Sequence, residues 1–424
     1  MTPRALIAGG GIGGLAAALA LSRAGWQARL FEQAPLFTEV GAGVQLGPNV
    51  VRLLHGWGLQ PALAGAAAFP ERLQVRDALS GHELGALALG ARMRQHYGAP
   101  YATIHRADLH ALLLQAVQAA GSAELVLATA VQGYVDSGRH VSLRTRPAAD
   151  GPAQILEDIR GDALIGADGL WSRVRGLMLG DAPPRATGHL AYRAMLPQAA
   201  LPERLRSQQV TAWLGPRLHA VHYPVRGGEW LNIVVIVHGQ VEGDLHSWDH
   251  HANGADLQAH LAPTHKLLRD LVQAVTDGGH ARGPSWRLWP LNDRPPMRGA
   301  HEQARGRVAL LGDAAHPMRP YLAQGAGMAI EDAAALGALL GQGAGPSADV
   351  AALLQRYAAG RWARNARVQA RSARNGRIFH ARGPLRWARN AALELLGDKL
   401  LDVPWLYGHG QGDTPPVQAA PAAR

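Results

Sequence analysis

The sequence predicts an α/β protein with three parts: a discontinuous domain of alternating strands and helices, a sheet-rich domain inserted into it, and C-terminal helices. Short apolar strands that end in glycine-containing turns occur far apart, at residues 5–8, 164–169 and 307–317. Strand-like segments lie between the last two of these, at residues 211–214, 219–224 and 230–237. The 424 residues, 47% of them hydrophobic, are enough for two or three domains.

A cluster of five glycines follows the first strand, at positions 9, 10, 11, 13 and 14. Glycine disfavours the continuous helix of a signal peptide or a membrane anchor, and the uncharged run already ends at Arg23. As a turn, Gly9, Gly11 and Gly14 fit the spacing G-x-G-x-x-G before an apolar helix at residues 15–22. The first glycine permits a tight turn, the second lets the backbone approach a pyrophosphate, and the third lets the helix pack on the strand.

A second strand, residues 27–31, ends at Glu32. An acid in this position can accept hydrogen bonds from the hydroxyls of an adenosine ribose. Together with the free N–H groups and the partial positive charge at the start of the helix, Glu32 predicts a dinucleotide-binding site. A signal peptide or an anchor is the alternative for this segment. We expect a cytoplasmic protein without a membrane span.

Local patterns predict the other elements and the domain boundaries. The glycine-rich loop 41–49 precedes a helix that starts at Val50, with Asn49 as its expected N-cap, and Arg106 begins a helix that ends near residue 120. Residues 328–340 and most of 350–400 are expected to be helical. The boundaries we predict are 1–75, 101–185 and 285–340 for the nucleotide-binding domain, 76–100 and 186–284 for the inserted domain, 341–410 for the C-terminal helices, and 411–424 for a disordered tail.

Composition excludes several classes of protein. The chain has no cysteine, which excludes structural disulfides, thiolate metal sites and reductases that use a redox-active cysteine pair. The net charge of +10 is dispersed along the chain, so nucleic acid is not an expected partner. In the stretch 356–389 we expect a solvated helix face formed by Arg364, Arg367, Arg371 and Arg374. An anionic partner or a subunit contact, as in a homodimer, is the alternative for this face.

Three motifs occur in a specific order. They are Gly9-x-Gly11-x-x-Gly14 with Glu32, the segment Ile165–Gly169 (IGADG), and the segment Leu311–Pro317 (LGDAAHP). In these motifs the chain resembles the single-component FAD-dependent aromatic hydroxylases, which include salicylate, 3-hydroxybenzoate and 6-hydroxynicotinate hydroxylases. The resemblance implies a Rossmann-like FAD-binding domain, bound FAD, NADH or NADPH as co-substrate, and O2. It also implies hydroxylation of a small phenolic or hydroxylated aromatic acid through a flavin hydroperoxide, with 3-hydroxybenzoate or salicylate favoured.

The same resemblance implies roles for individual residues. Glu32 would hold the ribose, Arg106 the phosphates, Asp313 the ribityl and pyrophosphate region, and Asp168 the cofactor and the nicotinamide. Backbone amides of the loop 321–327 would face the flavin ring, with the start of the next helix near N1 and O2. The full set of expected cofactor-binding residues is Gly9, Gly11, Gly14, Glu32, Gln45, Arg106, Asp168, Gly312, Asp313, Gly325 and Ala326. The alternatives are a solvated strand end for Glu32, a surface arginine for Arg106 and a helix cap for Asp313.

Hydroxylation of a phenol needs a base or a proton relay near the substrate hydroxyl. On the strand around residues 218–224, His219, Val221 and Tyr223 should share one face, while His222 points to the other. The pair His219 and Tyr223 resembles the substrate-side pair of the 3-hydroxybenzoate and 6-hydroxynicotinate hydroxylases. This implies that His219 is the base or relay and that Tyr223 is a hydrogen-bond partner of the substrate. A satisfied histidine and tyrosine of the core are the alternative.

The expected substrate-lining residues are Val221, Pro320 and Tyr321, and departures from the relatives leave the substrate open. Gln45 and Tyr321 stand where the 6-hydroxynicotinate enzymes have histidines. Pro320 stands where the 3-hydroxybenzoate 6-hydroxylases have a glutamine. Neither the aromatic acid nor the ring position attacked follows from the sequence.

Other functions are kept open. One is a hydroxylase of a larger lipophilic substrate, such as a quinone precursor or a polyketide. A second is a flavin oxidase or dehydrogenase that inserts no oxygen, and a third is a non-enzymatic FAD-bound protein that binds anionic surfaces. A metal site at His246, Asp249, His250 and His251 is considered, but the polar surroundings indicate a surface loop, and we expect no metal.

Overall fold

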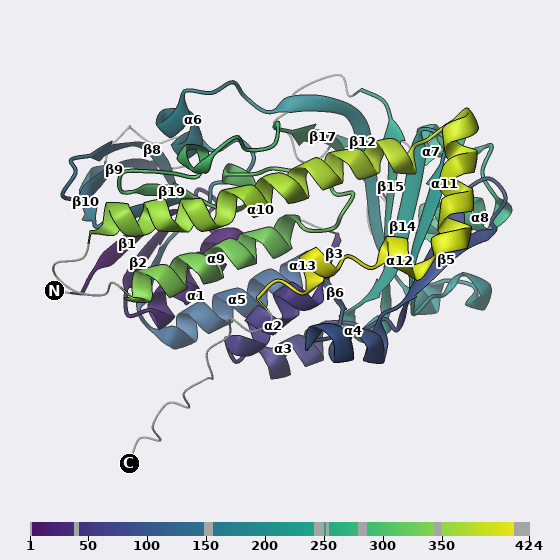
Figure 1. The fold of residues 1–424 in the computed structure, drawn as a ribbon, viewed down its shortest axis with the longest axis horizontal. Coiled ribbons are helices and arrows are strands. Elements are labelled where there is room, and N and C mark those ends of the chain that lie inside the picture. Colours follow the sequence, from purple (N-terminus) through teal and green to yellow (C-terminus); the bar gives the residue numbers. More distant parts are fainter. Residues whose placement is uncertain are drawn as a thin grey trace, which may run out of the picture.

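The computed structural model describes residues 2–37, 42–147, 156–240, 250–251, 254–278, 286–342 and 349–410. Two large sheets lie toward opposite ends of the long axis, and helix α10 (Val350–Phe379) runs from one to the other (Figure 1). The expected discontinuous α/β architecture is confirmed, because each sheet takes strands from widely separated parts of the chain. The predicted tail, residues 411–424, and the candidate metal residues His246 and Asp249 lie outside the described residues, as do the side chains of His250 and His251.

The first sheet has six strands in the order β18-β19-β11-β1-β2-β7. All neighbouring pairs are parallel except β18 with β19. The strands are β1 Arg4–Ala8, β2 Gln27–Phe31, β7 Ala123–Val126, β11 Ala163–Gly166, β18 Ala304–Arg305 and β19 Val308–Leu310. The central strands are short and apolar because both faces of this sheet are covered.

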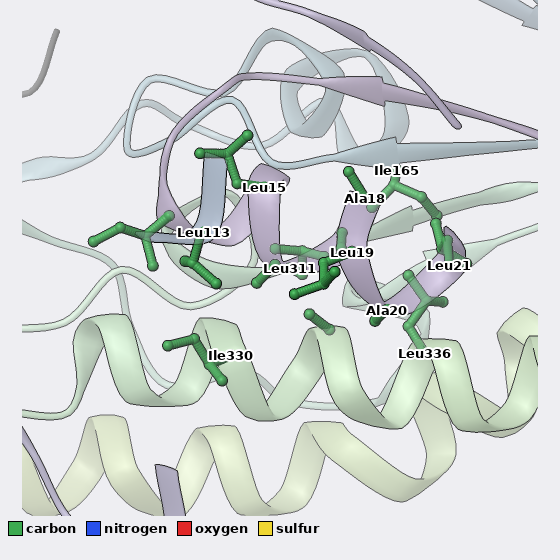
Figure 2. Packing of buried hydrophobic residues seen from close by; sticks show 14 of the residues in the cluster. Leu15, Ala18, Leu19, Ala20, Leu21, Leu113, Ile165, Leu311, Ile330 and Leu336 are labelled. Carbon is green, nitrogen blue, oxygen red and sulfur yellow. The ribbon is translucent and has the colours of Figure 1, made fainter. Parts of the chain in front are cut away.

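Helices α1 (Ile12–Arg23), α5 (Arg106–Ala120) and α9 (Gly325–Gln342) pack together in the core cluster on one face of this sheet. Figure 2 shows leucines of α1 between Ile165 on the sheet side and Ile330 and Leu336 of α9. A Cβ on Gly337 would lie 2.9 Å from the backbone oxygen of Ala20, so α9 approaches α1 more closely than any side chain would allow. The apolar helix α1 therefore lies at the centre of the domain, between the sheet and α9.

The opposite face carries a three-stranded antiparallel sheet in the order β10-β9-β8 and helix α6 (Arg173–Leu179). Its strands are β8 Thr129–Asp136, β9 Val141–Pro147 and β10 Leu156–Gly161. A two-stranded sheet joins β3 (Gly43–Leu46) to β6 (Ala102–His105). Further helices are α2 Pro48–Gly56, α3 Gln60–Ala66, α4 Gly90–Tyr97, α11 Gly383–Leu396, α12 Asp398–Leu401 and α13 Pro404–Tyr407.

The second large sheet has eight strands in the order β16-β17-β12-β15-β14-β13-β4-β5. They are β4 Arg72–Asp77, β5 Glu83–Ala88, β12 Arg185–Pro197, β13 Val210–Gly215, β14 Leu218–Val225, β15 Trp230–His238, β16 His250–His251 and β17 Arg287–Asp293. Helices α7 (Gly254–Leu261) and α8 (Lys266–Gly278) cover one face with an apolar cluster. The other face packs against residues of α9 and α10, so it meets the first domain. The sheet takes β4 from the predicted range 1–75 and β17 from the range 285–340.

Two local predictions are wrong. Asn49 does not cap α2, because Pro48 occupies the first helical position and Gly47 is the N-cap. Asn49 lies inside the helix, and its side-chain amide donates to Glu331 Oε1 at 2.7 Å. Helix α1 begins at Ile12, directly after the turn glycine Gly11, and not at Leu15.

Of the four α10 arginines expected on a solvated face, Arg367 and Arg374 are exposed, whereas Arg364 and Arg371 are half-buried. Arg361 is buried and pairs with Glu331 at 3.0 Å and with Asp332 at 2.8 Å, and Arg364 pairs with Glu331 at 2.7 Å. Arg367 lies 4.0 Å from the ring centroid of Trp405. Two acids of α9 face α10 inside the core, and buried charges need partners. No described helix is long and apolar enough to cross a membrane.

Candidate functional site

The turn between β1 and α1 has geometry that requires glycine. Gly9 has φ +101°, and a Cβ there would lie 2.4 Å from the carbonyl oxygen of Ala167. A Cβ on Gly14 would lie 1.9 Å from the carbonyl oxygen of Gly9. Gly9 thus lets the turn pass close to the end of β11, and Gly14 lets α1 pack against the turn.

The start of α1 offers backbone donors to an anion. Its N-cap is Gly11, which has no side chain to cap the helix, and its first turn contains no acid. Glu32, at the end of β2, accepts hydrogen bonds from the backbone N–H groups of Gly10 at 2.7 Å and Ala34 at 2.8 Å. These residues fit a dinucleotide whose pyrophosphate lies at the helix start and whose ribose lies beside Glu32.

The turn after β19 and the start of α9 also leave space for a ligand, as the start of α1 does. Gly312 has φ +58°, and its N–H donates to Asp332 Oδ2 at 3.2 Å. Asp313 is exposed, and its carboxylate has no hydrogen bond to any described residue. Gly325 and Ala326 begin α9, and nothing lies within 4 Å of a Cβ built on Gly325. This end of α9 is accessible to a ligand.

Two of the three other expected cofactor residues considered next, Gln45 and Asp168, form hydrogen bonds that no sequence motif indicated. Arg106 is the first residue of α5 and is half-buried. The side-chain oxygen of Gln45, on β3, accepts a hydrogen bond from the Tyr101 hydroxyl at 2.7 Å. Asp168 stabilises the start of α6, because it accepts hydrogen bonds from the Ser172 hydroxyl at 2.5 Å and from the backbone N–H of Val174 at 3.0 Å. Burial raises the pKa of Asp168 in spite of these bonds.

The large sheet presents His219, Val221 and Tyr223 on the face that meets the first domain. They stand opposite Ile236, Val234 and Asn232 of β15. Val221 packs with Tyr321, which lies in the loop just before α9. His222 points to the other face, where it lines a cavity together with Arg76, Trp213 and other residues.

His219 is buried and neutral. Its Nδ1 lies 2.7 Å from Nε2 of His380, and its ring meets the edge of Tyr321 with centroids 5.0 Å apart. Burial, helped by His189, lowers the pKa of His219 to about 3. Its other ring nitrogen, Nε2, has no hydrogen bond to a described residue and can accept a proton in the tautomer that carries hydrogen on Nδ1. His380 follows the last turn of α10, and no sequence motif indicated it.

Tyr223 connects the large sheet to the first domain. Its hydroxyl donates to the carbonyl oxygen of Gly43 at 2.7 Å, and the N–H of Gly43 donates to Asn232 Oδ1 at 2.6 Å. The phenolic oxygen of Tyr223 keeps its capacity to accept a further hydrogen bond. Tyr321 is buried and bonds through its hydroxyl to Nδ1 of His189, whereas Pro320 is exposed.

Arg193 on β12 is a candidate site residue that no sequence motif indicated. It stands opposite Val234, in the same row as Val221, so it faces the first domain. Its guanidinium lies 4.2 Å from the ring centroid of Trp289, and its Nε is inaccessible to solvent without a hydrogen-bond partner. No described acid pairs with Arg193, and burial lowers its pKa to about 10. A cation held in this way lacks a counter-ion.

Comparisons with known proteins agree with this geometry. A family model described as FAD binding domain matches residues 2–222 and 244–372. The chain is 38% identical to a 3-hydroxybenzoate 6-hydroxylase of Polaromonas naphthalenivorans, over 96% of each chain. It is 36% identical to a 6-hydroxynicotinate 3-monooxygenase of Bordetella bronchiseptica, over 87% of this chain and 90% of the other. A solved salicylate hydroxylase substrate complex is similar with a TM-score of 0.78 and 27% identity, over 97% of each chain.

Proposed function

Because this chain belongs to the family of FAD-dependent aromatic hydroxylases, we propose that it uses NADH or NADPH and O2 to hydroxylate a small phenolic carboxylic acid. Of the acids considered, 3-hydroxybenzoate is favoured over salicylate, because the chain is 38% identical to 3-hydroxybenzoate 6-hydroxylases of two organisms. The observation that carries the proposal is one face of the large sheet, which directs a neutral imidazole, His219, and an unpaired guanidinium, Arg193, toward the FAD-binding domain.

The cofactor site is part of the proposal. FAD, when bound, supplies the oxygen-activating chemistry. Gly9, Gly11 and Gly14 let the backbone approach its pyrophosphate, and Glu32 binds its ribose. The other residues proposed to hold FAD are Gln45, Arg106, Asp168, Gly312, Asp313, Gly325 and Ala326. Asp168 acts there through the position of α6, whose first turn it holds.

His219 accepts the phenolic proton at Nε2 in the tautomer whose Nδ1–H donates to His380. A neutral imidazole is the form that can do so, and removal of this proton makes the ring a better nucleophile. Tyr223, whose hydroxyl donates to the carbonyl oxygen of Gly43 in the ligand-free protein, turns to donate a hydrogen bond to an oxygen of the bound substrate. Val221, Pro320 and Tyr321 line the substrate site.

Arg193 distinguishes an acidic substrate from a lipophilic one. An unpaired, partly desolvated cation would be a liability in a pocket for a quinone precursor or a polyketide. A carboxylate would supply the missing partner through charge-assisted hydrogen bonds. The same argument favours an anionic small molecule over an extended anionic surface, because Arg193 faces an interior.

The test measures NADH and NADPH oxidation by the FAD-loaded protein, with products followed by mass. The panel is 3-hydroxybenzoate, salicylate, 4-hydroxybenzoate, 6-hydroxynicotinate and the neutral analogue 3-hydroxybenzyl alcohol. We expect one acid to stimulate oxidation and gain one oxygen atom, and the alcohol to stimulate it far less. Stimulation by the alcohol alone would transfer the proposal to a lipophilic substrate, and consumption of substrate without oxygen gain would indicate an oxidase.

A cytoplasmic location belongs to this proposal, and the burial of β1 and α1 in the core supports it. No metal ion is proposed. A homodimer stays a prediction. Helix α11 offers one surface for it, because Trp387 and Leu395 are 69% and 84% exposed.

A further inference from the structure

Four imidazoles gather beside the proposed substrate site. His189 on β12 and His238 on β15 are paired neighbours on adjacent strands, with ring centroids 4.4 Å apart. The ring of His380 lies 4.9 Å from that of His219 and 4.9 Å from that of His238. These residues come from three strands and the end of a helix, so only the tertiary structure brings them together.

Two hydrogen bonds join three of these rings in series. Nδ1 of His219 lies 2.7 Å from Nε2 of His380, and Nδ1 of His380 lies 2.9 Å from Nε2 of His238. The bonds at His380 therefore use its two opposite nitrogens, as transfer of a proton through the ring requires. The series begins at His219, which is 4% exposed, and ends at His238, which is partly exposed.

We propose that His380 and His238 form, with His219, a proton wire that carries the phenolic proton of the substrate to solvent. The proposal rests on the function proposed above, in which His219 accepts that proton. His380 and His238 touch neither substrate nor cofactor, so they are positioning and relay residues.

The transfer balances in protons. The phenol O–H bond breaks and an N–H bond forms at Nε2 of His219. The proton on Nδ1 of His219 moves to Nε2 of His380, the one on Nδ1 of His380 moves to Nε2 of His238, and the one on Nδ1 of His238 passes to water. The substrate becomes a phenolate and one proton is released, without any ring having to hold two protons. After hydroxylation, a proton from solvent enters at Nδ1 of His238 and the transfers run in reverse. The proton on Nε2 of His219 passes to the phenolate of the product, which restores the first tautomers.

The surroundings keep the rings neutral, as the wire requires. Burial is the largest cause that lowers the pKa of His219, His380 and His238. The charged groups that face the cluster are mostly cationic: Arg217, Arg319 and Arg382, with Asp293 as the acid. The fourth imidazole, His189, stands beside the series and bonds to the Tyr321 hydroxyl.

A metal ion is the competing occupant of this cluster. The ligand nitrogens of His189, His238 and His380 lie within 4.8 Å of one another. A bound metal would take the nitrogens that join His380 to His238 and interrupt the series. A metal that stays bound at one equivalent through dialysis against EDTA would overturn the proposal.

The kinetic test follows proton release after 3-hydroxybenzoate, or whichever acid the panel selects, is mixed with the FAD-loaded protein in weak buffer with a pH indicator. His238→Gln removes the outer end of the wire without touching His219. We expect proton release at least about tenfold slower, an unchanged Kd for the acid, and partial rescue by added imidazole. His222→Gln, a buried histidine on the opposite face of the same sheet, is the matched control and should release the proton at the wild-type rate. Equal rates in wild type and His238→Gln would refute the wire.

A second measurement needs no substrate. In protein labelled with 15N-histidine, the wire predicts neutral rings at pH 7 and couplings through the N–H···N bonds, which His380→Gln abolishes. Couplings without hydroxylation of any acid would confirm the hydrogen bonds between the histidines but reject the proposed function. Hydroxylation with unslowed proton release in His238→Gln would reject the wire alone, and the absence of the couplings would also count against it.

Discussion

Replacing Arg193 with methionine should stabilise the ligand-free protein while it weakens binding of an acidic substrate. The pKa of Arg193 falls from its usual 12.5 to about 10 through burial. At about 1.4 kcal/mol per pKa unit, the difference corresponds to ~3 kcal/mol of destabilisation when the group is charged. The side chain is partly exposed, and solvent screening reduces the gain that we expect from methionine to about 1–2 kcal/mol.

The sign of the pH dependence follows from the lowered pKa. Because the folded protein binds this proton less tightly than the unfolded chain, the penalty is complete below pH 10. It decreases only as the pH rises from about 10 toward 12.5. At neutral pH the full effect should therefore be visible as a higher Tm of Arg193→Met without ligand.

Binding should change in the opposite direction. A charge-assisted hydrogen bond contributes about 1.5–3 kcal/mol, so the Kd for the acid should rise roughly 10- to 150-fold. The assays are thermal unfolding without ligand and titration of the FAD-loaded protein with 3-hydroxybenzoate and 3-hydroxybenzyl alcohol. Arg185→Met, on the same strand but 62% exposed in its side chain and paired with Asp293, is the control. A lower Tm for Arg193→Met together with wild-type affinity for the acid would refute the reasoning.

Four further predictions concern the framework of the site. Gly14→Ala should abolish FAD retention on gel filtration, because its Cβ would lie 1.9 Å from a backbone oxygen; Gly121→Ala, in open space but at φ +69°, should retain FAD in spite of a modest strain cost. Arg361→Met should destabilise the fold by about 3–5 kcal/mol in denaturant unfolding, since it leaves buried Glu331 and Asp332 short of a partner. The pKa of Glu331 is lowered from 4.5 to about 2. The ionised carboxylate therefore contributes its full stabilisation above pH 4.5, and this contribution is lost as the pH falls toward 2. Unfolding of Glu331→Gln with the same pH dependence as wild type in an acid titration would contradict this. Tyr223→Phe should cost about 1 kcal/mol through the lost bond to β3 and raise the KM for the acid, and an unchanged KM would remove Tyr223 from the substrate site.

The sequence by itself determined the fold class and the turns that follow β1 and β19. The glycine turn, Glu32 and the turn at Gly312 are each encoded within a few adjacent residues, where steric limits allow only certain side chains. The alternation of β14 is equally local, because a strand places every second residue on one face. These features predicted the fold class and the strand that carries His219 and Tyr223 without knowledge of any distant contact.

The tertiary structure decided what each of those side chains meets. His219 and His380 are 161 positions apart, and Asn49 and Glu331 are 282 apart, so no local pattern could pair them. Arg193 looks like any strand arginine until the sheet register places it over Trp289 without a counter-ion. The ion pair of Arg364 with Glu331 was not predicted, because helical spacing shows which residues share a face but not which surface that face contacts. Local geometry therefore fixes the elements and their faces, whereas charge pairing and proton pathways depend on contacts that only packing creates.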